Sequence, residues 1–337
     1  MRFAVLRPLC LAAALAAAPF TGAFAAQSDP AVPKLPPASW KPDRPVEFVV
    51  QAAAGGGSDI FARTMAKILT DEKIVTVPVN VVNKPGGSGA VAYSYLRGKK
   101  GDPHVIATAT GSYLTTPIQG HSPVSYKDFT NLSVLCVEDY IGVVKADSPY
   151  KSLKDLVEAA RKKPNGIRIG GSSVGSSDSI IENRIEKAAG IQLNYITFQS
   201  GGEVNAALLG GSVDLATPNP SEAAQLMTAG RLRGIAMFSP ERLEKYPKVP
   251  TAREQGVDVT LEQFRGVIAA GGITKDQSLF WQNAMVKVFQ SAAFKKYMSE
   301  NGLRPLLKVG DDAEKYVAQQ NQFFTQVLTE LGIAKKH

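Results

Sequence analysis

The residues that could do chemistry gather in two glycine- and serine-rich loops, each between a predicted strand and a predicted helix. The two groups share small or acidic side chains just before a helix: Gly56, Gly57, Ser58 and Asp59 in the first, and Ser176, Ser177 and Asp178 in the second. Serine and aspartate are favoured at helix N-termini, so one interpretation is that they only cap the helices. The other is that the free backbone N–H groups of each helix start, which glycine leaves uncovered, bind an anion such as a carboxylate or a phosphate. The two interpretations are compatible.

The second loop also contains a possible nucleophile. Residues 171–175 read Gly-Ser-Ser-Val-Gly, which matches the G-x-S-x-G pattern of a nucleophile elbow with Ser173 at its centre. A triad of that type needs a histidine after the serine. His104 and His121 precede Ser173, and the histidine that follows, His337, is the last residue. A secreted serine esterase is therefore the enzymatic alternative, and the histidine positions argue against it.

Metal and cofactor chemistry has no support in the sequence. Three isolated histidines and two distant cysteines give no metal-ligand spacing. The 54–59 loop lacks the lysine of a phosphate-binding P-loop, and its three glycines do not form the G-x-G-x-x-G pattern. We therefore expect no cofactor, no metal and no enzymatic activity. Cys136 lies in an apolar stretch, which favours a buried, unreactive thiol.

These loops must be positioned by alternating strands and helices. Apolar runs predict strands at 46–50, 79–82, 105–110, 167–169, 213–216 and 235–238. Helical patterns lie between them, for example at 153–163 and 178–189, and long amphipathic segments at about 277–296 and 313–331 end the chain. This alternation indicates an α/β fold in which mostly parallel sheets are flanked by helices on both faces.

The N-terminal segment has the pattern of a secretory signal peptide. Residues 1–25 combine a short basic head, an apolar stretch at 8–20 and the small-residue ending Ala23-Phe24-Ala25. The apolar stretch is too short to cross a bilayer. Residues 26–44 are rich in proline and are predicted to form an extended lead-in. The 337-residue chain is thus predicted to be exported, and its remaining length suits two domains.

The charge of the chain is moderately positive but not clustered. The net charge is +8, and the lysines and arginines occur in scattered pairs and triplets. Nucleic-acid binding needs a clustered basic face, so we expect none. A mild positive field still favours an anionic ligand.

Several sequence blocks resemble the periplasmic solute receptors of tripartite tricarboxylate transporters, also called TctC-like or Bug-type binding proteins. The resemblance covers about residues 45–307, and its blocks keep their order along the chain. They are 45–50, 55–59 with Ala62-Arg63, 83–89, 126–129, 209–214, 229–233 and 247–251. The first of them, Pro-Val-Glu-Phe-Val-Val followed by Gly-Gly-Gly-Ser-Asp, is the most specific.

This resemblance implies a two-lobed periplasmic binding protein that closes on its ligand about a hinge. Lobe 1 would comprise 45–137 and 266–337, lobe 2 would comprise 138–265, and the hinge strands would cross near 132–145 and 262–270. Members of the family bind a small carboxylate between the first glycine-rich loop and the Gly/Ser loop of lobe 2, and pass it to a two-component membrane permease. We expect a monomer in the periplasm. A receptor that docks on a membrane histidine kinase would need the same cleft, so that alternative stays open.

The loop pattern and the resemblance together predict the ligand-binding residues. They are Gly56, Gly57, Ser58, Asp59, Ser112, Tyr113, Ser176, Ser177, Asp178, Gln199, Ser200, Asn219 and Arg265. Ser112 and Tyr113 follow a strand at the edge where open α/β sheets bind ligands, although helix capping explains them equally well. Asn219, between two prolines, could be only a turn residue.

Arg265 supports a more specific hypothesis. It lies between Phe264 and Gly266 in an apolar strand, where a guanidinium needs a partner, although a surface cation is the plainer interpretation. A second carboxylate of the ligand would be a bidentate partner. The hypothesis is therefore an aliphatic or aromatic dicarboxylate ligand.

The sequence departs from the family pattern at several of these places. Gly171, Ser173 and Ser179 stand where the family usually has serine, glycine and histidine, and residues 197–200 replace Pro-Tyr-Lys-Gly. The Phe264-Arg265-Gly266 block replaces two aromatic residues and a glycine. Because several of these positions should set specificity, the ligand skeleton is not predicted.

Overall fold

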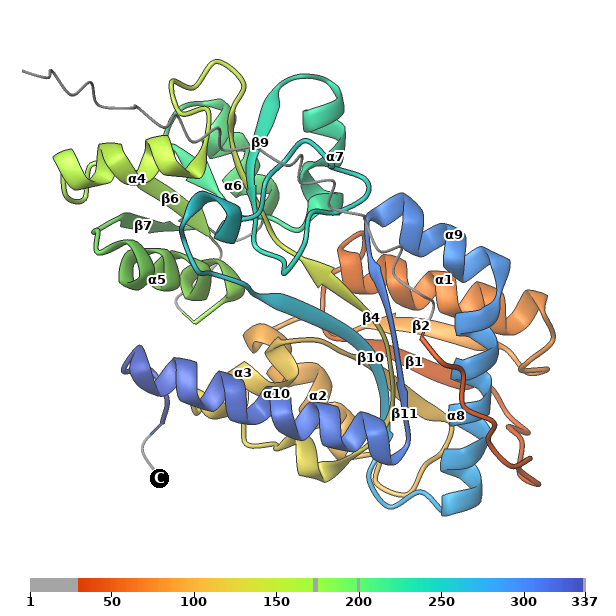
Figure 1. The fold of residues 1–337 in the computed structure, drawn as a ribbon. Helices are drawn as coiled ribbons and strands as arrows, with labels where there is room; N and C mark the ends of the chain where they lie inside the picture. Colours follow the sequence, from red (N-terminus) through yellow and green to blue (C-terminus); the bar gives the residue numbers. More distant parts are fainter. Residues whose placement is uncertain (1–29, 172–174, 199–200, 336–337) are drawn as a thin grey trace, which may run out of the picture.

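The computed structural model describes residues 30–171, 175–198 and 201–335 and shows two β-sheets flanked by helices (Figure 1). The predicted signal peptide, the possible nucleophile Ser173, and Gln199 and Ser200 lie outside the described residues. The α/β class was predicted correctly. Both sheets are mixed, since antiparallel strands join the parallel ones.

The first sheet has six strands in the order β11-β4-β10-β3-β1-β2. They are β1 (Val46–Val50), β2 (Val79–Asn83), β3 (Val105–Ala109), β4 (Phe129–Asp139), β10 (Glu262–Ala270) and β11 (Arg304–Val309). We call this sheet and its helices lobe 1. The helices are α1 (Gly57–Asp71), α2 (Ala90–Arg97), α3 (Ser112–Ile118), α8 (Lys275–Gln290), α9 (Ala292–Asn301) and α10 (Asp311–Glu330).

Both faces of the first sheet are buried, which is why its central strands are apolar throughout. Successive side chains of a strand point to opposite faces. Phe48 accordingly lies in the core beneath α1, α8 and α9, and the next residue, Val49, lies in the core beneath α2, α3 and α10. Figure 1 shows these two groups of helices on opposite sides of the sheet.

The second sheet has five strands in the order β7-β6-β8-β5-β9. They are β5 (Ile141–Lys145), β6 (Arg168–Gly171), β7 (Asn194–Thr197), β8 (Leu215–Ala216) and β9 (Leu232–Met237). With the helices α4 (Leu153–Lys162), α5 (Ser177–Ala189), α6 (Gly201–Leu209) and α7 (Pro220–Thr228), this sheet forms lobe 2. Three short 3₁₀ turns, 87–89, 126–128 and 253–255, complete the described elements.

The chain crosses between the lobes at the predicted hinge segments. β4 ends at Asp139 and β5 begins at Ile141, and the chain returns from lobe 2 into β10. β4 and β10 pair antiparallel, with a register shift between Arg265 and Gly266. A Cβ on Gly266 would press on a backbone carbonyl of β4, so this position requires glycine. The exact lobe boundaries stay a prediction, since β4 and β10 run through them as single strands.

One helical prediction needed correction, and the N-terminal lead-in has contacts that the sequence did not predict. The single helix predicted at 277–296 is two helices, because Ser291 ends α8 and its Oγ accepts the backbone N–H of Phe294 at 3.1 Å to begin α9. The lead-in has no strand or helix in its described part, but it is docked on lobe 1. Ser39 and Trp40 donate backbone hydrogen bonds to Asp276, and the Trp40 ring packs edge-on against Phe280.

The described helices do not include one that is long and apolar enough to span a membrane. Cys136 is fully buried in β4, where burial raises the pKa of its thiol to about 12. The prediction that the thiol is buried is therefore confirmed, and the raised pKa agrees with low reactivity.

Candidate ligand-binding cleft

A cavity of about 450 Å³ lies between the two lobes. Lobe 1 and the crossing strands contribute Ser88, Gly111, Ser112, Thr115, Thr116, Gln119, His121, Tyr140 and Gln263. Lobe 2 contributes Gly175, Ser176, Ser177, Asp178, Gly201, Val204, Thr217, Pro218, Asn219 and Glu222. The described wall is therefore rich in hydroxyl and amide groups. It contains two carboxylates, Asp178 and Glu222, and no lysine or arginine.

The start of α5 forms one wall of this cavity. Ser176 is its N-cap, with the Oγ atom 3.5 Å from the backbone nitrogen of Ser179. Gly175 donates its backbone N–H to the Ser179 hydroxyl at 2.7 Å, which ties the loop to the first turn of the helix. The sequence prediction that Ser176, Ser177 and Asp178 begin a helix is confirmed, and the structure places all three on the cavity wall. The backbone N–H groups of a helix start and its dipole both favour an anion there.

Gly175 is a point of close approach between the two lobes on this wall. Its φ of +83° is a conformation that side chains rarely adopt. A Cβ at this position would also overlap the side-chain amide of Gln119, which belongs to lobe 1. Glycine is therefore required both for the turn into α5 and for the approach of the lobes.

Asp178 is held within a network of lobe 2. Its carboxylate accepts hydrogen bonds from the hydroxyls of Thr217 at 3.3 Å and Ser176 at 3.4 Å. The Tyr195 hydroxyl lies 3.2 Å from the Ser176 hydroxyl. A side chain at Gly171 would overlap Tyr195 and the Cβ of Asp178, so the departure from the family serine at 171 makes room for these two residues.

Glu222 is the second carboxylate of the wall and was not predicted from the sequence. It follows the α7 N-cap Asn219 by three residues, and part of the residue is exposed at the cavity while its carboxylate is shielded by the surrounding protein. The surrounding protein withdraws water from it, and Glu138 and Asp178 repel its charge. These effects raise the pKa of Glu222 to about 7, although Arg265 and the backbone N–H of Asn219 oppose them.

The first predicted loop is not on the described wall of this cavity. Gly56 is the N-cap of α1, and Ser58 and Asp59 are buried. The Asp59 carboxylate accepts the backbone N–H of Gly55 and the Nδ2–H of Asn83, both at 2.9 Å, and pairs with Arg63. For Asp59 the structure therefore favours the capping interpretation.

Arg265 occupies the space in front of α1. A Cβ on Gly57 would lie 2.6 Å from the Arg265 Nη2 atom, and Nη1 is 3.5 Å from the Ser58 hydroxyl. The buried guanidinium pairs with the buried carboxylate of Glu138, which also accepts a hydrogen bond from the Ser221 hydroxyl at 2.9 Å. The prediction that this arginine needs a partner holds, but the structure supplies that partner from β4 and not from a ligand. The argument from Arg265 for a dicarboxylate therefore no longer holds, and the dicarboxylate itself stays a prediction.

The remaining predicted residues divide between the wall and the core. Ser112 and Asn219 line the cavity, and the Asn219 side chain donates to the backbone carbonyl of Asp139 at 3.1 Å. Tyr113 is buried in the core of lobe 1, where its hydroxyl donates to the Tyr126 carbonyl at 3.0 Å. Its side chain is thus part of the packing between α3 and the sheet.

Several wall residues were missed by sequence reasoning. They are Ser88, Gly111, Thr115, Thr116, Gln119, His121, Tyr140, Gly175, Gly201, Val204, Thr217, Pro218, Glu222 and Gln263. Tyr140 and Gln263 illustrate why, since Tyr140 joins β4 to β5, Gln263 lies in β10, and the two meet through a 3.1 Å hydrogen bond. Only the pairing of β4 with β10 brings them together. Glu222 had one local signal, its position three residues after an N-cap asparagine.

A metal site is not among the features of this region. The described residues contain no group of three or more histidine, cysteine, aspartate or glutamate side chains that could hold a metal ion.

Comparison with known proteins identifies the architecture. The chain is 25% identical over 324 residues to the UPF0065 protein in the gbd 5′ region of Cupriavidus necator, covering 95% of this chain and 98% of the relative. It is 23% identical to the protein BugT of Bordetella pertussis, covering 88% and 91%.

Solved structures share the fold. The R. palustris protein Rpa4515 with adipate superposes with a TM-score of 0.80 at 23% identity, covering 87% of this chain and 99% of that one. MatC from Rhodopseudomonas palustris with bound malate gives a TM-score of 0.72 at 20% identity, covering 85% and 99%.

The family model described as "Tripartite tricarboxylate transporter family receptor" matches residues 61–333, which is most of the chain. Because the members of this family are described as receptors, the match agrees with the expectation that the protein is not an enzyme. The chain belongs to the TctC family of tripartite tricarboxylate transporter receptors.

Proposed function

We propose that this protein is an extracytoplasmic solute receptor that binds a small organic carboxylate in the cavity between its lobes. The observation that supports the proposal is the wall of the cavity: the first turn of α5 and a set of hydroxyl groups face a space of about 450 Å³ between two lobes. Adipate and malate are the ligands named for two proteins of the same fold.

The carboxylate would be held by the start of α5, with Ser176 and Ser177 on one side and Ser112 on the other. Hydroxyl and backbone N–H groups can stabilise the charge of a carboxylate without a cation, because a helix start adds its dipole to the hydrogen bonds. Asn219 would fix the hinge, since its side chain connects α7 to the end of β4.

The proposal is tested by thermal unfolding of the purified protein against mono-, di- and tricarboxylates. The protein is first unfolded and refolded so that any copurified ligand is removed. A ligand that binds only the folded state adds about 2.7 kcal/mol at one hundred times its dissociation constant, which is an easily measured shift. If no carboxylate stabilises the refolded protein, the proposal is wrong.

Export and delivery follow from the proposal and have separate tests. Mass spectrometry of protein from a periplasmic extract should show a chain that begins at Ala26. Delivery to a membrane permease should appear as uptake of the labelled ligand that requires both the receptor and the permease. A chain recovered only with its first 25 residues, in the cytoplasm, would contradict this part.

A further inference from the structure

Arg304, the first residue of β11, joins the two strands that cross between the lobes. β11, β4 and β10 lie side by side in lobe 1, and Arg304 stands opposite Val137 of β4 (Figure 1). Its guanidinium binds the Asp139 carboxylate through two hydrogen bonds, Nε–Oδ2 at 2.7 Å and Nη2–Oδ1 at 2.8 Å. Nη2 also donates to the carboxylate of Glu262. One arginine therefore bridges the last residue of β4 and the first residue of β10.

Without this arginine, the two carboxylates would repel each other. Glu262 and Asp139 lie directly opposite in the antiparallel ladder and form its end on the side of lobe 2. Like charges at opposite positions destabilise a strand pair. Burial raises the pKa of the Asp139 carboxyl, and Glu262 and Glu138 raise it further, while Arg304 opposes them. The positive charge of Arg304 thus allows the end of the ladder to stay paired.

The bridge is sheltered from water. The Asp139 side chain is fully buried, and the side chains of Arg304 and Glu262 are 20% and 31% exposed. An exposed ion pair contributes little, but removing one partner of a buried carboxylate leaves its charge uncompensated. If Arg304 is removed, separation of the two strands at this end is therefore favoured, because it admits water to Asp139.

The backbone hydrogen bonds change from lobe 1 to lobe 2 within one residue of this pair. On the outward crossing, the Tyr140 carbonyl accepts the backbone N–H of Phe238 of lobe 2 at 2.9 Å, and Ile141 begins β5. On the return crossing, the Leu261 N–H donates to the Phe238 carbonyl at 2.9 Å, whereas the next residue, Glu262, pairs within lobe 1. A rotation of one lobe relative to the other must therefore be absorbed by the backbone beside the bridged pair.

We infer that Arg304 is a positioning residue of the hinge. By binding Asp139 and Glu262 together, it keeps β4 and β10 paired up to their ends, so that the lobes rotate about the linkages 139–140 and 261–262. Without it, a longer and looser segment of both strands would take part in the movement. This inference goes beyond the proposed function and does not depend on the identity of the ligand.

The test measures the hinge in the refolded protein without ligand. Hydrogen–deuterium exchange reports the opening of the ladder. Spin labels on Lys67→Cys of α1 and Lys154→Cys of α4, both exposed positions, report the distance between the lobes. In Arg304→Met we expect the backbone amides of 135–141 and 260–265 to exchange at least about ten-fold faster, because local opening needs less free energy. The distribution of distances between the labels should broaden, while exchange within α1 stays unchanged.

Further variants assign the effect to the bridge. Arg304→Met combined with Asp139→Asn removes the buried charge and the repulsion together, so it should recover at least half of the change in exchange on a logarithmic scale. Arg304→Lys keeps the charge but loses the two-pronged geometry, and a smaller acceleration at the same segments is expected. This milder variant carries the test if Arg304→Met does not fold.

A matched control removes an arginine from an ion pair inside lobe 2. Arg242 Nε lies 2.9 Å from the Glu254 carboxylate, and neither residue belongs to a crossing strand. Arg242→Met should therefore leave both the exchange of the hinge segments and the distance distribution unchanged. Circular dichroism establishes that each variant is folded.

Three outcomes would overturn the inference. The first is unchanged exchange and unchanged distances in the Arg304 variants that fold. The second is faster exchange spread evenly over lobe 1 with an unchanged distance distribution, which would assign Arg304 to the stability of the sheet alone. The third is a double variant that recovers nothing, which would exclude the carboxylates as the cause. These outcomes leave the proposed function untouched, because that function is tested by ligand binding.

Discussion

The ion pair of Arg265 and Glu138 shows how one buried charge determines its neighbourhood. Both side chains are almost fully buried, and they come from adjacent strands, β10 and β4. Removing one partner of a buried pair leaves the other charge uncompensated, which is far more costly than removing both.

Glu138→Gln should therefore destabilise the protein by about 3 kcal/mol or more, because the Arg265 guanidinium would stay buried without its counter-charge. Urea unfolding measures this loss. The double variant Glu138→Gln with Arg265→Met should recover at least half of it, and Glu158→Gln on the exposed face of α4 serves as the control. A loss below about 1 kcal/mol would mean that water reaches the guanidinium.

Glu222 should make stability depend on pH. Its pKa is about 7 in the folded protein and 4.5 in a model compound, so the folded state disfavours its charged form. The resulting penalty is absent below pH 4.5 and develops as the pH rises toward 7 and above. Without ligand, Glu222→Gln should therefore raise the melting temperature at pH 8 by about 2 °C and leave it unchanged at pH 4.5. Equal shifts at both pH values would contradict this assignment.

At the scale of elements, Gly175 at the turn into α5 lies directly against the Gln119 side chain of lobe 1. Gly175 combines a positive φ with direct proximity to Gln119, whereas Gly190 at the other end of α5 has a φ of +63° and open space around its Cβ position. Both glycines therefore have a positive φ that disfavours a side chain. Gly175 is also in contact with the other lobe, whereas the Cβ position of Gly190 faces open space.

Gly175→Ala should weaken ligand binding ten-fold or more, because the added methyl group prevents the lobes from approaching at Gln119. Gly190→Ala is the matched control: it has a similar backbone cost, about 1 kcal/mol of stability, but should bind ligand normally. Calorimetric titration measures both affinities. Adding Gln119→Ala should restore part of the binding lost in Gly175→Ala, and a lack of any recovery would argue against steric contact as the cause.

Much of the fold could be predicted because it depends on local patterns. The strands 46–50 and 105–109 and the helix that starts at Ser177 follow from apolar runs and helix-start residues that lie within a few positions of one another. The break at Ser291 was missed because the apolar pattern continues through it. A single N-cap serine, which is weak evidence in a long amphipathic segment, ends one helix and begins the next.

The site could be predicted best where its residues belong to one loop, although Ser112 and Asn219, elsewhere in the chain, were also predicted and line the cavity. Ser176, Ser177 and Asp178 are consecutive, and the structure places them together on the cavity wall. Arg265 and Glu138 are 127 positions apart, and the periodicity of neither strand indicates that they meet. Gly56 and Ser58 were expected on the wall by analogy between the two loops, but the Arg265 side chain stands in front of that helix.

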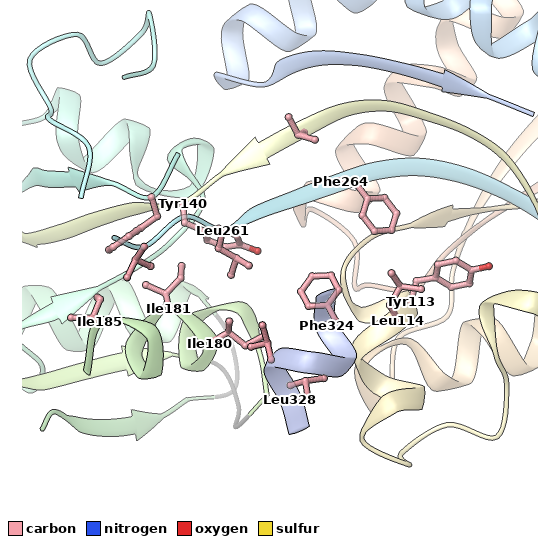
Figure 2. Packing of buried hydrophobic residues seen from close by; sticks show 14 of the residues in the cluster. Tyr113, Leu114, Tyr140, Ile180, Ile181, Ile185, Leu261, Phe264, Phe324 and Leu328 are labelled. Atoms are coloured by element: carbon pink, nitrogen blue, oxygen red, sulfur yellow. The ribbon is translucent and has the colours of Figure 1, made fainter. Parts of the chain in front are cut away.

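At the scale of the whole molecule, one apolar cluster joins the two lobes. Figure 2 shows side chains of α5, among them Ile180 and Ile181, in the same cluster as Phe324 and Leu328 of α10 and Phe264 of β10. Beside this cluster, Lys187 and Glu330 form a half-exposed ion pair at 3.6 Å that also links the lobes. An exposed ion pair contributes at most about 1 kcal/mol, so the apolar cluster dominates this connection.

Thermal unfolding should therefore show one cooperative transition for both lobes, because the apolar contacts between them are lost when either lobe unfolds. Differential scanning calorimetry tests this expectation through the agreement of the calorimetric and van't Hoff enthalpies. Lys187→Ala, which removes only the ion pair, should preserve the single transition. Two resolved transitions in the unaltered protein would show that the lobes unfold independently.

The burial of Cys136 gives the protein an internal reporter of strand separation. This cysteine, the single one among the described residues, lies in β4 opposite Arg265 of β10 and Pro305 of β11. A thiol reagent can reach it only when the middle of the lobe 1 sheet opens, and the high pKa of the thiol slows the reaction further. The labelling rate should thus measure how often the sheet opens. A ligand that stabilises the closed protein should lower this rate, even though it binds outside the sheet.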